Sequence, residues 1–291
     1  MKVKLATIEE AAMEDNAGEL DETFRRNGCC LIRLKPTTSN VIRKAMEASV
    51  ALFRQPAEVK AAFVDSTTRV GYRSVGIEYS QSLNRPDLME SLSYSIKHEG
   101  IIHGLAQGEA ETEWRKSSRA GFQALDLIFI RLLNTLHSSV SPGRAVPYKP
   151  FPDSFSANGS FLQTNHYTSE LMSRSILQDC HEDANLVTLL LSDADGLELS
   201  LDRSSFVGCS PPADCLLAFS GSLMTKLSRG RYPTVYHRVV RLPHVMERKS
   251  MMYFANPSPD EFLFPWGTGG EENLAQIAAE SPQRFGLPKL A

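Results

Sequence analysis

The amino-acid sequence predicts a mainly β protein with α content: a β-barrel or sandwich on which an N-terminal layer of helices packs. A change of pattern along the 291 residues predicts this class. Up to His137 apolar residues recur at helical spacing, whereas from Phe161 onward short β-branched and aromatic runs recur between turn residues. Several short strands at close spacing are typical of an antiparallel sandwich or barrel. Because barrels of roughly 200–250 residues often form one domain, we expect residues 1–291 to be a single domain.

The N-terminal part carries one clear strand signal and several helix signals. The apolar run Gly28–Leu34, followed by a proline, suits a buried strand, and Val41–Phe53 has apolar residues at helical spacing. Pro56 is placed like the first residue of a further helix. Trp114–His137 predicts a long amphipathic helix that packs against a sheet. Residues 138–160 are rich in Ser, Pro and Gly and predict a connecting loop.

The C-terminal part supplies the predicted strands of the barrel. Each is a short apolar run with β-branched or aromatic residues, bounded by turn residues. The six predicted strands are Phe161–Tyr167, Leu186–Leu191, Leu197–Leu201, Cys215–Phe219, Val235–Arg241 and Ser250–Ala255. The sequence contains no internal repeat and no low-complexity segment.

The composition favours an ordinary globular protein of a reducing compartment. Apolar residues make up 42%, and 31 basic against 34 acidic residues give a net charge of −3. We therefore expect neither a nucleic-acid partner nor a membrane-surface partner. The N-terminus lacks the apolar stretch of a signal peptide, and the most apolar run, Leu125–Leu133, is broken by Asp126 and Arg131. Five cysteines without C-x-x-C spacing argue against a zinc ribbon or a disulfide framework, so we expect a cytoplasmic protein.

Three residues of the predicted barrel form a candidate metal site. Residues two apart on a strand point the same way, so His181 and Asp183 can face one pocket while Glu182 faces away. His237 lies in another predicted strand, and an antiparallel barrel can bring it beside this pair. Two imidazoles and one carboxylate are the facial triad of non-haem Fe(II) oxygenases, which leaves coordination positions open. An H-x-D triplet alone is common, and a lone histidine on a strand is more often structural.

A candidate carboxylate site lies shortly after His237. Arg248, Ser250, Met252 and Phe254 alternate onto one face of a predicted strand. A guanidinium binds a carboxylate through two parallel hydrogen bonds and keeps its charge, and a hydroxyl beside it adds a further donor. Because an unpaired buried charge is costly, this pair of residues implies a carboxylate ligand near the metal.

With these residues identified, the sequence resembles the isopenicillin N synthase-like family of Fe(II)/2-oxoglutarate-dependent oxygenases over nearly its whole length. The matching core segments are His181–Leu191, Gly230–Val239, Arg248–Phe254 and the N-x-Y element Asn165–Tyr167. The matching N-terminal segments are Gly28–Cys30, Phe53–Pro56 with Lys60, Gly71–Tyr72 and Met89–Ser91. The chain departs from the family pattern at Thr168, at Ser228–Gly230 and at Ser222, none of which is a ligand position.

The resemblance implies a double-stranded β-helix (jelly-roll) barrel with the N-terminal helical layer packed on it. Within the single domain it implies an N-terminal α/β cap region over residues 1–150, a metal-binding jelly-roll core over residues 151–270 and a C-terminal tail over residues 271–291.

The resemblance also implies the cofactors and the residues that hold them. Fe(II) is expected on His181, Asp183 and His237. The co-substrate 2-oxoglutarate is expected on Arg248, Ser250 and Tyr167, with dioxygen as the second co-substrate and ascorbate as an additional reductant. No catalytic residue beyond the metal ligands is implied.

The implied reaction couples decarboxylation of 2-oxoglutarate, which gives succinate and carbon dioxide, to oxidation of an unactivated C–H bond. Hydroxylation is the expected outcome; desaturation, epoxidation or ring formation would use the same residues. Retention of Asp183 argues against a halogenase. One alternative is an oxidase of this family that does not use 2-oxoglutarate, of the isopenicillin N synthase type or ascorbate-dependent, in which Arg248 and Ser250 bind another carboxylate. A second alternative is a non-catalytic binding protein of this fold.

Three residues are candidates for contact with the substrate: Phe254, Asn165 and Tyr72. For Phe254 and Tyr72 the alternative role is packing. We expect a small-molecule substrate of specialised metabolism, such as antibiotic biosynthesis, and a monomer or weak homodimer. Three arginines that could suggest an acidic substrate are expected to be scattered surface residues: Arg69, Arg73 and Arg85.

Overall fold

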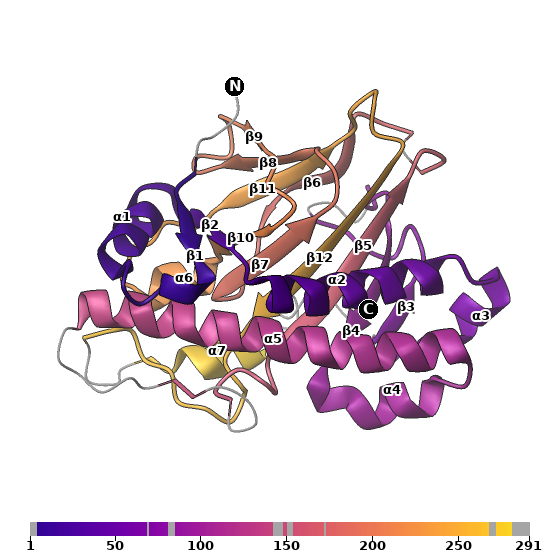
Figure 1. Ribbon diagram of the computed structural model, residues 1–291, viewed down its shortest axis with the longest axis horizontal. Coiled ribbons are helices and arrows are strands. Elements are labelled where there is room, and N and C mark those ends of the chain that lie inside the picture. The colour runs from indigo at the N-terminus through magenta and orange to yellow at the C-terminus, as the bar shows by residue number, and fades with distance from the viewer. Residues whose placement is uncertain are drawn as a thin grey trace.

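Two β-sheets and a layer of helices make up the protein (Figure 1). The computed structural model describes residues 5–68, 70–80, 85–141, 148–149, 154–171, 173–267 and 272–280. The strands of the large sheet are β1 (Thr7–Glu9), β2 (Cys29–Arg33), β3 (Gly71–Arg73), β4 (Glu90–Tyr94), β5 (Phe161–Thr168), β7 (Val187–Ser192), β10 (Cys215–Ser220) and β12 (Glu247–Ala255). The strands of the small sheet are β6 (Ile176–Glu182), β8 (Leu197–Ser200), β9 (Val207–Cys209) and β11 (Tyr236–Val240).

The large sheet combines strands from both halves of the chain. Its order is β1-β2-β10-β7-β12-β5-β4-β3, and the order of the small sheet is β6-β11-β8-β9. Strands β1 and β2 pair in parallel, and the other pairs are antiparallel. The N-terminal strands therefore extend the sheet at both edges, β2 beside β10 and β4 beside β5.

Helices cover the outer face of the large sheet (Figure 1). The helices are α1 (Ala17–Asn27), α2 (Pro36–Phe53), α3 (Ala57–Ala62), α4 (Glu99–Leu105), α5 (Glu109–Val140), α6 (Ser222–Leu227) and α7 (Leu274–Glu280), with short 3₁₀ turns at Glu10–Ala12 and Ile96–His98. Helices α2 and α5 cross that face together, and a Cβ added to Gly121 of α5 would lie 2.9 Å from the Cβ of Ala45 of α2. The absence of a side chain at position 121 therefore allows α2 and α5 to approach each other closely.

Alternation along β12 divides its side chains between two environments. Met251, Tyr253 and Ala255 are buried in the core that the helices form with the sheet. Met252 and Phe254 belong instead to the cluster between the two sheets, together with Leu190 of β7, Leu217 of β10 and Leu199 of β8. The face of β12 that carries the even-numbered residues therefore looks into the barrel, as period-2 alternation requires.

One buried charge in the helical layer has a clear structural role. Asp126, which interrupts the most apolar stretch of the sequence, is fully buried in α5. Its Oδ1 accepts hydrogen bonds from the hydroxyl of Tyr253 at 2.7 Å and from Ser154 at 3.1 Å. These bonds satisfy the carboxylate and attach α5 to the centre of the large sheet.

The predicted elements recur with shifted ends, and five strands of the described residues were not among the predicted ones: β1, β3, β4, β6 and β9. Helix α2 begins at Pro36 rather than Val41, and α5 extends the predicted helix at both ends. Strand β6, which carries His181, was missed because its sequence ILQDCHE lacks an apolar run. Part of the predicted 138–160 loop, residues 142–147 and 150–153, lies outside the described residues, as do residues 271 and 281–291 of the predicted tail. The region boundaries at 150 and 270 stay a prediction.

Among the described residues, no helix combines the length and the apolar character that crossing a membrane requires.

Candidate metal and carboxylate-binding site

The two histidines and the aspartate of the predicted triad come together at one end of the small sheet. His181, near the end of β6, is the direct cross-strand partner of His237 on β11, and Asp183 follows β6 immediately. One ligand atom from each of the three residues lies within 4.8 Å of the others. The Oδ1 atom of Asp183 lies 3.7 Å from Nε2 of His181 and 3.8 Å from Nε2 of His237. All three ligand atoms therefore face one point.

Hydrogen bonds behind these atoms fix their orientation. The Nδ1 atom of His181 lies 2.8 Å from the backbone oxygen of Asp179, which can only accept, so Nδ1 carries the proton and Nε2 keeps its lone pair. The Thr188 hydroxyl donates to Oδ2 of Asp183 at 2.5 Å, and the Asn185 amide donates to the Thr188 hydroxyl at 2.9 Å. Oδ1 of Asp183 is left for a metal. Such partners hold ligands in place and tune their basicity.

The turn that carries Asp183 packs on a glycine. A Cβ at Gly221 would lie 2.3 Å from the backbone oxygen of Asn185 and 2.6 Å from that of Asp183. The backbone N–H of Ser222 donates to the backbone oxygen of Asp183 at 2.8 Å. Position 222 thus supports the turn through its main chain, which explains why the family departure at Ser222 leaves the triad in place.

Burial prepares His237 for metal binding. The side chain is buried, and burial together with the neighbouring His181 lowers the pKa of His237 to about 4, although Asp183 acts in the opposite direction. At neutral pH the imidazole is therefore uncharged and has a lone pair to donate. Two neutral imidazoles and one carboxylate on one side of a barrel form a donor set that fits Fe(II).

Arg248 provides a buried cation on the inward face of β12. Only 1% of its surface is exposed, and its Nη1 donates to the Ser250 hydroxyl at 3.1 Å. Its Nε and Nη2 have no hydrogen-bond partner among the described residues. Burial lowers the pKa of Arg248, although Tyr167 and the Asp193 and Asp195 carboxylates act in the opposite direction.

Tyr167 lies directly beside this arginine. It is the cross-strand partner of Arg248 on β5, and the guanidinium carbon lies 5.4 Å from the centre of its ring. Two unpaired N–H groups of a planar guanidinium, next to a hydroxyl, match the geometry of a carboxylate. The residues present therefore fit the carboxylate end of 2-oxoglutarate, and Arg248, Ser250 and Tyr167 lie together as the sequence analysis expected.

Of the predicted substrate contacts, two face the barrel interior and one does not. Asn165 pairs with Ser250, and Phe254 stacks on Phe161 with ring centres 4.6 Å apart. Tyr72 lies on the opposite face of the sheet, where it packs against the helical core and donates to Glu90 at 2.7 Å. The structure therefore gives Tyr72 the packing role and does not bring it to Asn165 and Phe254.

The inward-facing residue of β3 is Arg73, which the sequence analysis expected on the surface. That expectation was wrong: Arg73 is 5% exposed and donates to Ser91 at 3.1 Å and to Gln163 at 2.6 Å. Adjacent strand residues face opposite sides, so placing Tyr72 on the outer face required Arg73 to face inward. Arg85 is exposed, as the sequence analysis expected, and pairs with Asp179 at 3.4 Å, and Arg69 lies outside the described residues.

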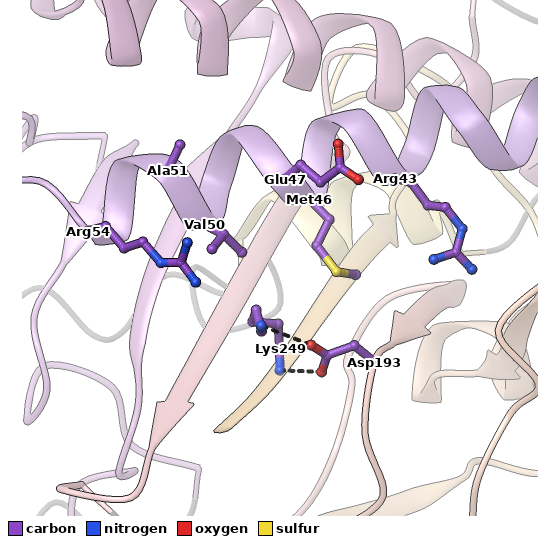
Figure 2. Close-up of a pocket in the computed structure, with 8 residues that line it drawn as sticks. All are labelled: Arg43, Met46, Glu47, Val50, Ala51, Arg54, Asp193 and Lys249. Atoms are coloured by element: carbon purple, nitrogen blue, oxygen red, sulfur yellow. Dashed lines mark hydrogen bonds and ion pairs between the residues drawn. The ribbon is translucent and has the colours of Figure 1, made fainter. Parts of the chain in front are cut away.

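A separate pocket of about 320 Å³ lies on the outer side of the large sheet (Figure 2). It is formed by one face of α2, including Met46 and Val50, and by Lys249 and Asp193. The Lys249 ammonium contacts the Asp193 carboxylate at 3.2 Å. Because Lys249 alternates with Arg248, this pocket opens on the face of β12 away from the triad, and it contains none of the predicted site residues.

Two family models match the chain. The model of the 2OG-Fe(II) oxygenase superfamily matches residues 148–257, and the model of the N-terminal region of non-haem dioxygenases in morphine synthesis matches residues 2–115. The fold, the donor set and these matches place the chain in the 2OG-Fe(II) oxygenase superfamily. The chain belongs to the isopenicillin N synthase-like family of that superfamily, as the sequence motifs indicated.

Individual relatives agree with this assignment. Gibberellin 3-beta-dioxygenase 2 of Arabidopsis thaliana is 31% identical over 113 residues, which are 38% of this chain and 32% of the relative. Protein DMR6-LIKE OXYGENASE 2 of Arabidopsis thaliana is 25% identical over 235 residues, which are 77% of this chain and 63% of the relative. The chain thus matches less than two thirds of the length of either relative.

A solved structure shows the same fold. The full-length Neurospora crassa T7H, in complex with alpha-KG, superposes with a TM-score of 0.75 at 19% identity and covers 94% of this chain and 96% of its own. The similarity confirms the jelly-roll barrel with its helical layer.

Proposed function

We propose that the protein is an Fe(II)/2-oxoglutarate-dependent dioxygenase that oxidises an unactivated C–H bond of a small molecule. The observation that carries this proposal is Arg248, a buried cation with two unpaired N–H groups on the inner wall of the barrel that also holds the triad. A buried charge without a partner is unfavourable unless a ligand of opposite charge pairs with it. Membership of the 2OG-Fe(II) oxygenase superfamily supports 2-oxoglutarate as that ligand.

Each group of residues has a separate task in this proposal. His181, Asp183 and His237 would hold Fe(II), a donor set of two imidazoles and one carboxylate that would leave this metal able to bind the co-substrates. Bound Fe(II) supplies the oxidising chemistry, in which decarboxylation of 2-oxoglutarate to succinate and carbon dioxide accompanies oxidation of the substrate.

The carboxylate-binding residues hold the co-substrate in one orientation. Arg248 offers two parallel hydrogen bonds to its distal carboxylate, and the Ser250 hydroxyl adds a further donor. Tyr167 lies beside them on β5, and its hydroxyl donates to Gln178 at 3.1 Å. Apolar side chains pack around Tyr167 at that end, among them Leu177 and Val239. A fixed orientation matters because the chelating end of the co-substrate must reach the metal.

The substrate is expected against the inward-facing residues of β5 and β12. Phe254 with Phe161 offers an aromatic wall, and Asn165 offers a polar contact. Hydroxylation is the proposed outcome; desaturation, epoxidation or ring formation would use the same residues and differ in how the substrate radical is held. The match to the N-terminal model of non-haem dioxygenases in morphine synthesis supports a role in specialised metabolism. We propose that the enzyme acts on a small molecule as a monomer or weak homodimer in the cytoplasm.

An anaerobic titration of the Fe(II)-loaded protein with 2-oxoglutarate tests the proposal. We expect a saturable metal-to-ligand charge-transfer band, and no such band from the Arg248→Met variant at the same concentrations. A wild-type protein that binds iron but gives no band would contradict the proposal. It would favour the 2-oxoglutarate-independent oxidase, with Arg248 on the carboxylate of the substrate.

A further inference from the structure

Two buried arginines lie on the inner face of the large sheet, Arg248 on β12 and Arg73 on β3. Cross-strand pairing places Arg73 in one row with Ser91 of β4, Asn165 of β5 and Ser250 of β12. Neighbouring strands lie about 4.8 Å apart, so about 14 Å of sheet separates Arg73 from Ser250. The two arginines therefore face the same interior from positions three strands apart.

The barrel interior beside this row is not filled by side chains. The stacked rings of Phe161 and Phe254 face inward and are nevertheless partly exposed. The side chain of His181, in the triad, is 18% exposed. A small molecule held against this wall would therefore meet an aromatic pair at one end and the polar side chains of β3 and β4 at the other.

The protein already uses the two guanidinium groups differently. Nε and Nη2 of Arg248 have no partner, which leaves one edge of that guanidinium open. The same edge of Arg73 is occupied, because Nε donates to Ser91 at 3.1 Å and Nη2 donates to Gln163 at 2.6 Å. Nε of Arg73 also lies 3.1 Å from Oε1 of Glu78. Arg73 thus has a counter-ion within the barrel.

One nitrogen of Arg73 is left for a ligand. Nη2 carries two hydrogens, and it donates to both Ser93 and Gln163. Nη1 carries two more and donates to none of the residues that the structure describes. Unlike the unpaired nitrogens of Arg248, Nη1 is not enclosed by protein atoms. A single free nitrogen can donate to one oxygen, whereas paired recognition of a carboxylate uses two neighbouring nitrogens.

The charge around Arg73 also disfavours a carboxylate ligand. Glu78 is held beside the guanidinium by hydrogen bonds from the Ser91 hydroxyl and, at 3.1 Å, from the Gln163 amide. A second carboxylate at Nη1 would meet the like charge of Glu78, and such a juxtaposition is unfavourable. A neutral carbonyl or hydroxyl oxygen can accept from Nη1 without this repulsion.

We propose that Arg73 determines substrate specificity: its Nη1 binds a neutral carbonyl or hydroxyl oxygen of the substrate, and Glu78 sets the preference for a neutral group over a carboxylate. This inference rests on the proposed function and names a feature of its substrate. Arg248 then serves the charged co-substrate, and Arg73 serves the uncharged end of the substrate.

The test measures how the protein selects between matched probes that differ only in an amide and a carboxylate. Phenylacetamide with phenylacetate and 3-phenylpropanamide with 3-phenylpropanoate suit the aromatic pair. Mn(II) in the triad broadens the NMR signals of a probe that binds close by, and the Zn(II)-loaded protein is the diamagnetic reference. We expect the amide of each pair to bind more tightly by about tenfold, the value of one hydrogen bond to a charged group. Equal binding, or tighter binding of the carboxylates, would overturn the inference.

Two variants separate recognition from a structural role. Arg73→Met should weaken binding of the amides by about tenfold and abolish the preference, whereas loss of a structural contact would weaken both members of a pair equally. Glu78→Gln leaves the charge of Arg73 without a counter-ion, so the preference should fall by about tenfold or reverse. Arg238→Met is the matched control, because Arg238 pairs with Glu198 on the small sheet, and it should keep the wild-type preference.

The outcome for Glu78→Gln decides the question even if Arg73→Met does not fold. An unchanged preference in Glu78→Gln would overturn the inference. Titrating the same Mn(II)-loaded protein with 2-oxoglutarate, and repeating the probe measurements without it, keeps the two claims apart. Failure to bind 2-oxoglutarate would overturn the proposed function, whereas a lack of selectivity in a protein that binds 2-oxoglutarate would overturn only the role of Arg73.

Discussion

His237 and His181 are direct cross-strand partners on β11 and β6, and the centres of their rings lie 4.2 Å apart. Their Nε2 atoms both face Oδ1 of Asp183, which lies just beyond the end of β6. The pairing of two strands of the small sheet therefore creates the donor set before any metal binds. Preorganised ligands of this kind lose little conformational freedom on binding.

Replacing the aspartate should abolish metal binding. Asp183→Ala removes the only carboxylate of the triad, so we expect loss of detectable Fe(II) binding at micromolar protein and loss of iron-dependent turnover. Equilibrium dialysis against Fe(II) under argon measures the binding. Asp202→Ala, at an exposed turn of the same sheet, is the matched control and should bind iron normally. Normal turnover of Asp183→Ala would exclude the triad.

The threonine behind the aspartate should affect the metal without being a ligand. Thr188→Val keeps the shape of the side chain but removes the 2.5 Å hydrogen bond to Oδ2 of Asp183. Changes of this kind weaken metal affinity by about 10–100-fold. Competition with a metal-sensitive chelator measures that affinity. An unchanged affinity would mean that the turn at Asp183 is held by the backbone contact with Ser222 alone.

Replacing the buried arginine should weaken co-substrate binding without lowering the stability of the ligand-free protein. Arg248→Met removes a guanidinium whose Nε and Nη2 are unpaired, so the ligand-free protein should unfold at the same or a higher temperature. Binding of 2-oxoglutarate should weaken by at least about a hundredfold, since breaking a buried charge pair costs about 3–5 kcal/mol. Thermal unfolding with and without 2-oxoglutarate shows both effects.

The control for that variant is another arginine on a strand. Arg238 on β11 pairs with Glu198 at 2.6 Å and is partly exposed. Arg238→Met should leave the response to 2-oxoglutarate unchanged. An equal loss of that response in both variants would point to a general defect of the barrel.

Low pH should destabilise the protein because it protonates the Glu90 carboxylate. Burial raises the pKa of Glu90, but hydrogen bonds from His166, Lys60 and Tyr72 outweigh it and lower that pKa from 4.5 to about 2. Because the folded-state pKa is depressed, the stabilisation is complete above pH 4.5 and is lost as the pH falls toward 2. The free energy of unfolding should lose about 2–3 kcal/mol over that window.

Denaturant titrations of the wild type and of Glu90→Gln, compared between pH 6 and pH 2, check this source of stability. The difference in unfolding free energy between the two proteins should shrink as the pH falls. A difference that is constant with pH would show that protonation of the Glu90 carboxylate does not change the stability of the protein.

The close crossing of two helices should depend on one glycine. Gly121→Ala would place a Cβ 2.9 Å from that of Ala45, and overpacking of this kind costs about 1–3 kcal/mol. Gly104, in α4, has no atom within 4 Å of an added Cβ, so Gly104→Ala should be neutral or stabilising by up to about 1 kcal/mol. Urea unfolding of both variants provides the comparison; equal stability would contradict tight packing at this crossing.

The donor residues were predictable from sequence because strand periodicity is local. His181 and Asp183, or Arg248 and Ser250, share a face in any extended strand, whatever the tertiary structure. The sequence analysis placed His181 and Asp183 on a strand but did not predict where that strand begins and ends. The reason is that β6 lacks an apolar run, and its conformation depends on pairing with β11. Local pattern thus identified the ligands but not the extent of the strand that carries His181.

The role of Arg73 could not be derived from sequence for a related reason. Whether Tyr72 or Arg73 faces the barrel depends on the register of β3 against β4, and a shift of one residue would exchange them. That register depends on tertiary contacts, such as the bond between Tyr72 and Glu90. The hydrogen bonds of Arg73 to Ser91 and Gln163 connect three strands, so they exist only once those strands pair.

The most direct test of the account is anomalous diffraction at the iron absorption edge, from crystals grown anaerobically with Fe(II) and 2-oxoglutarate. We predict a single strong iron peak at bonding distance, about 2.0–2.2 Å, from Nε2 of His181, Oδ1 of Asp183 and Nε2 of His237. Density for 2-oxoglutarate should extend from that peak to paired contacts with Nε and Nη2 of Arg248. An iron peak elsewhere, or a co-substrate bound away from Arg248, would contradict the account.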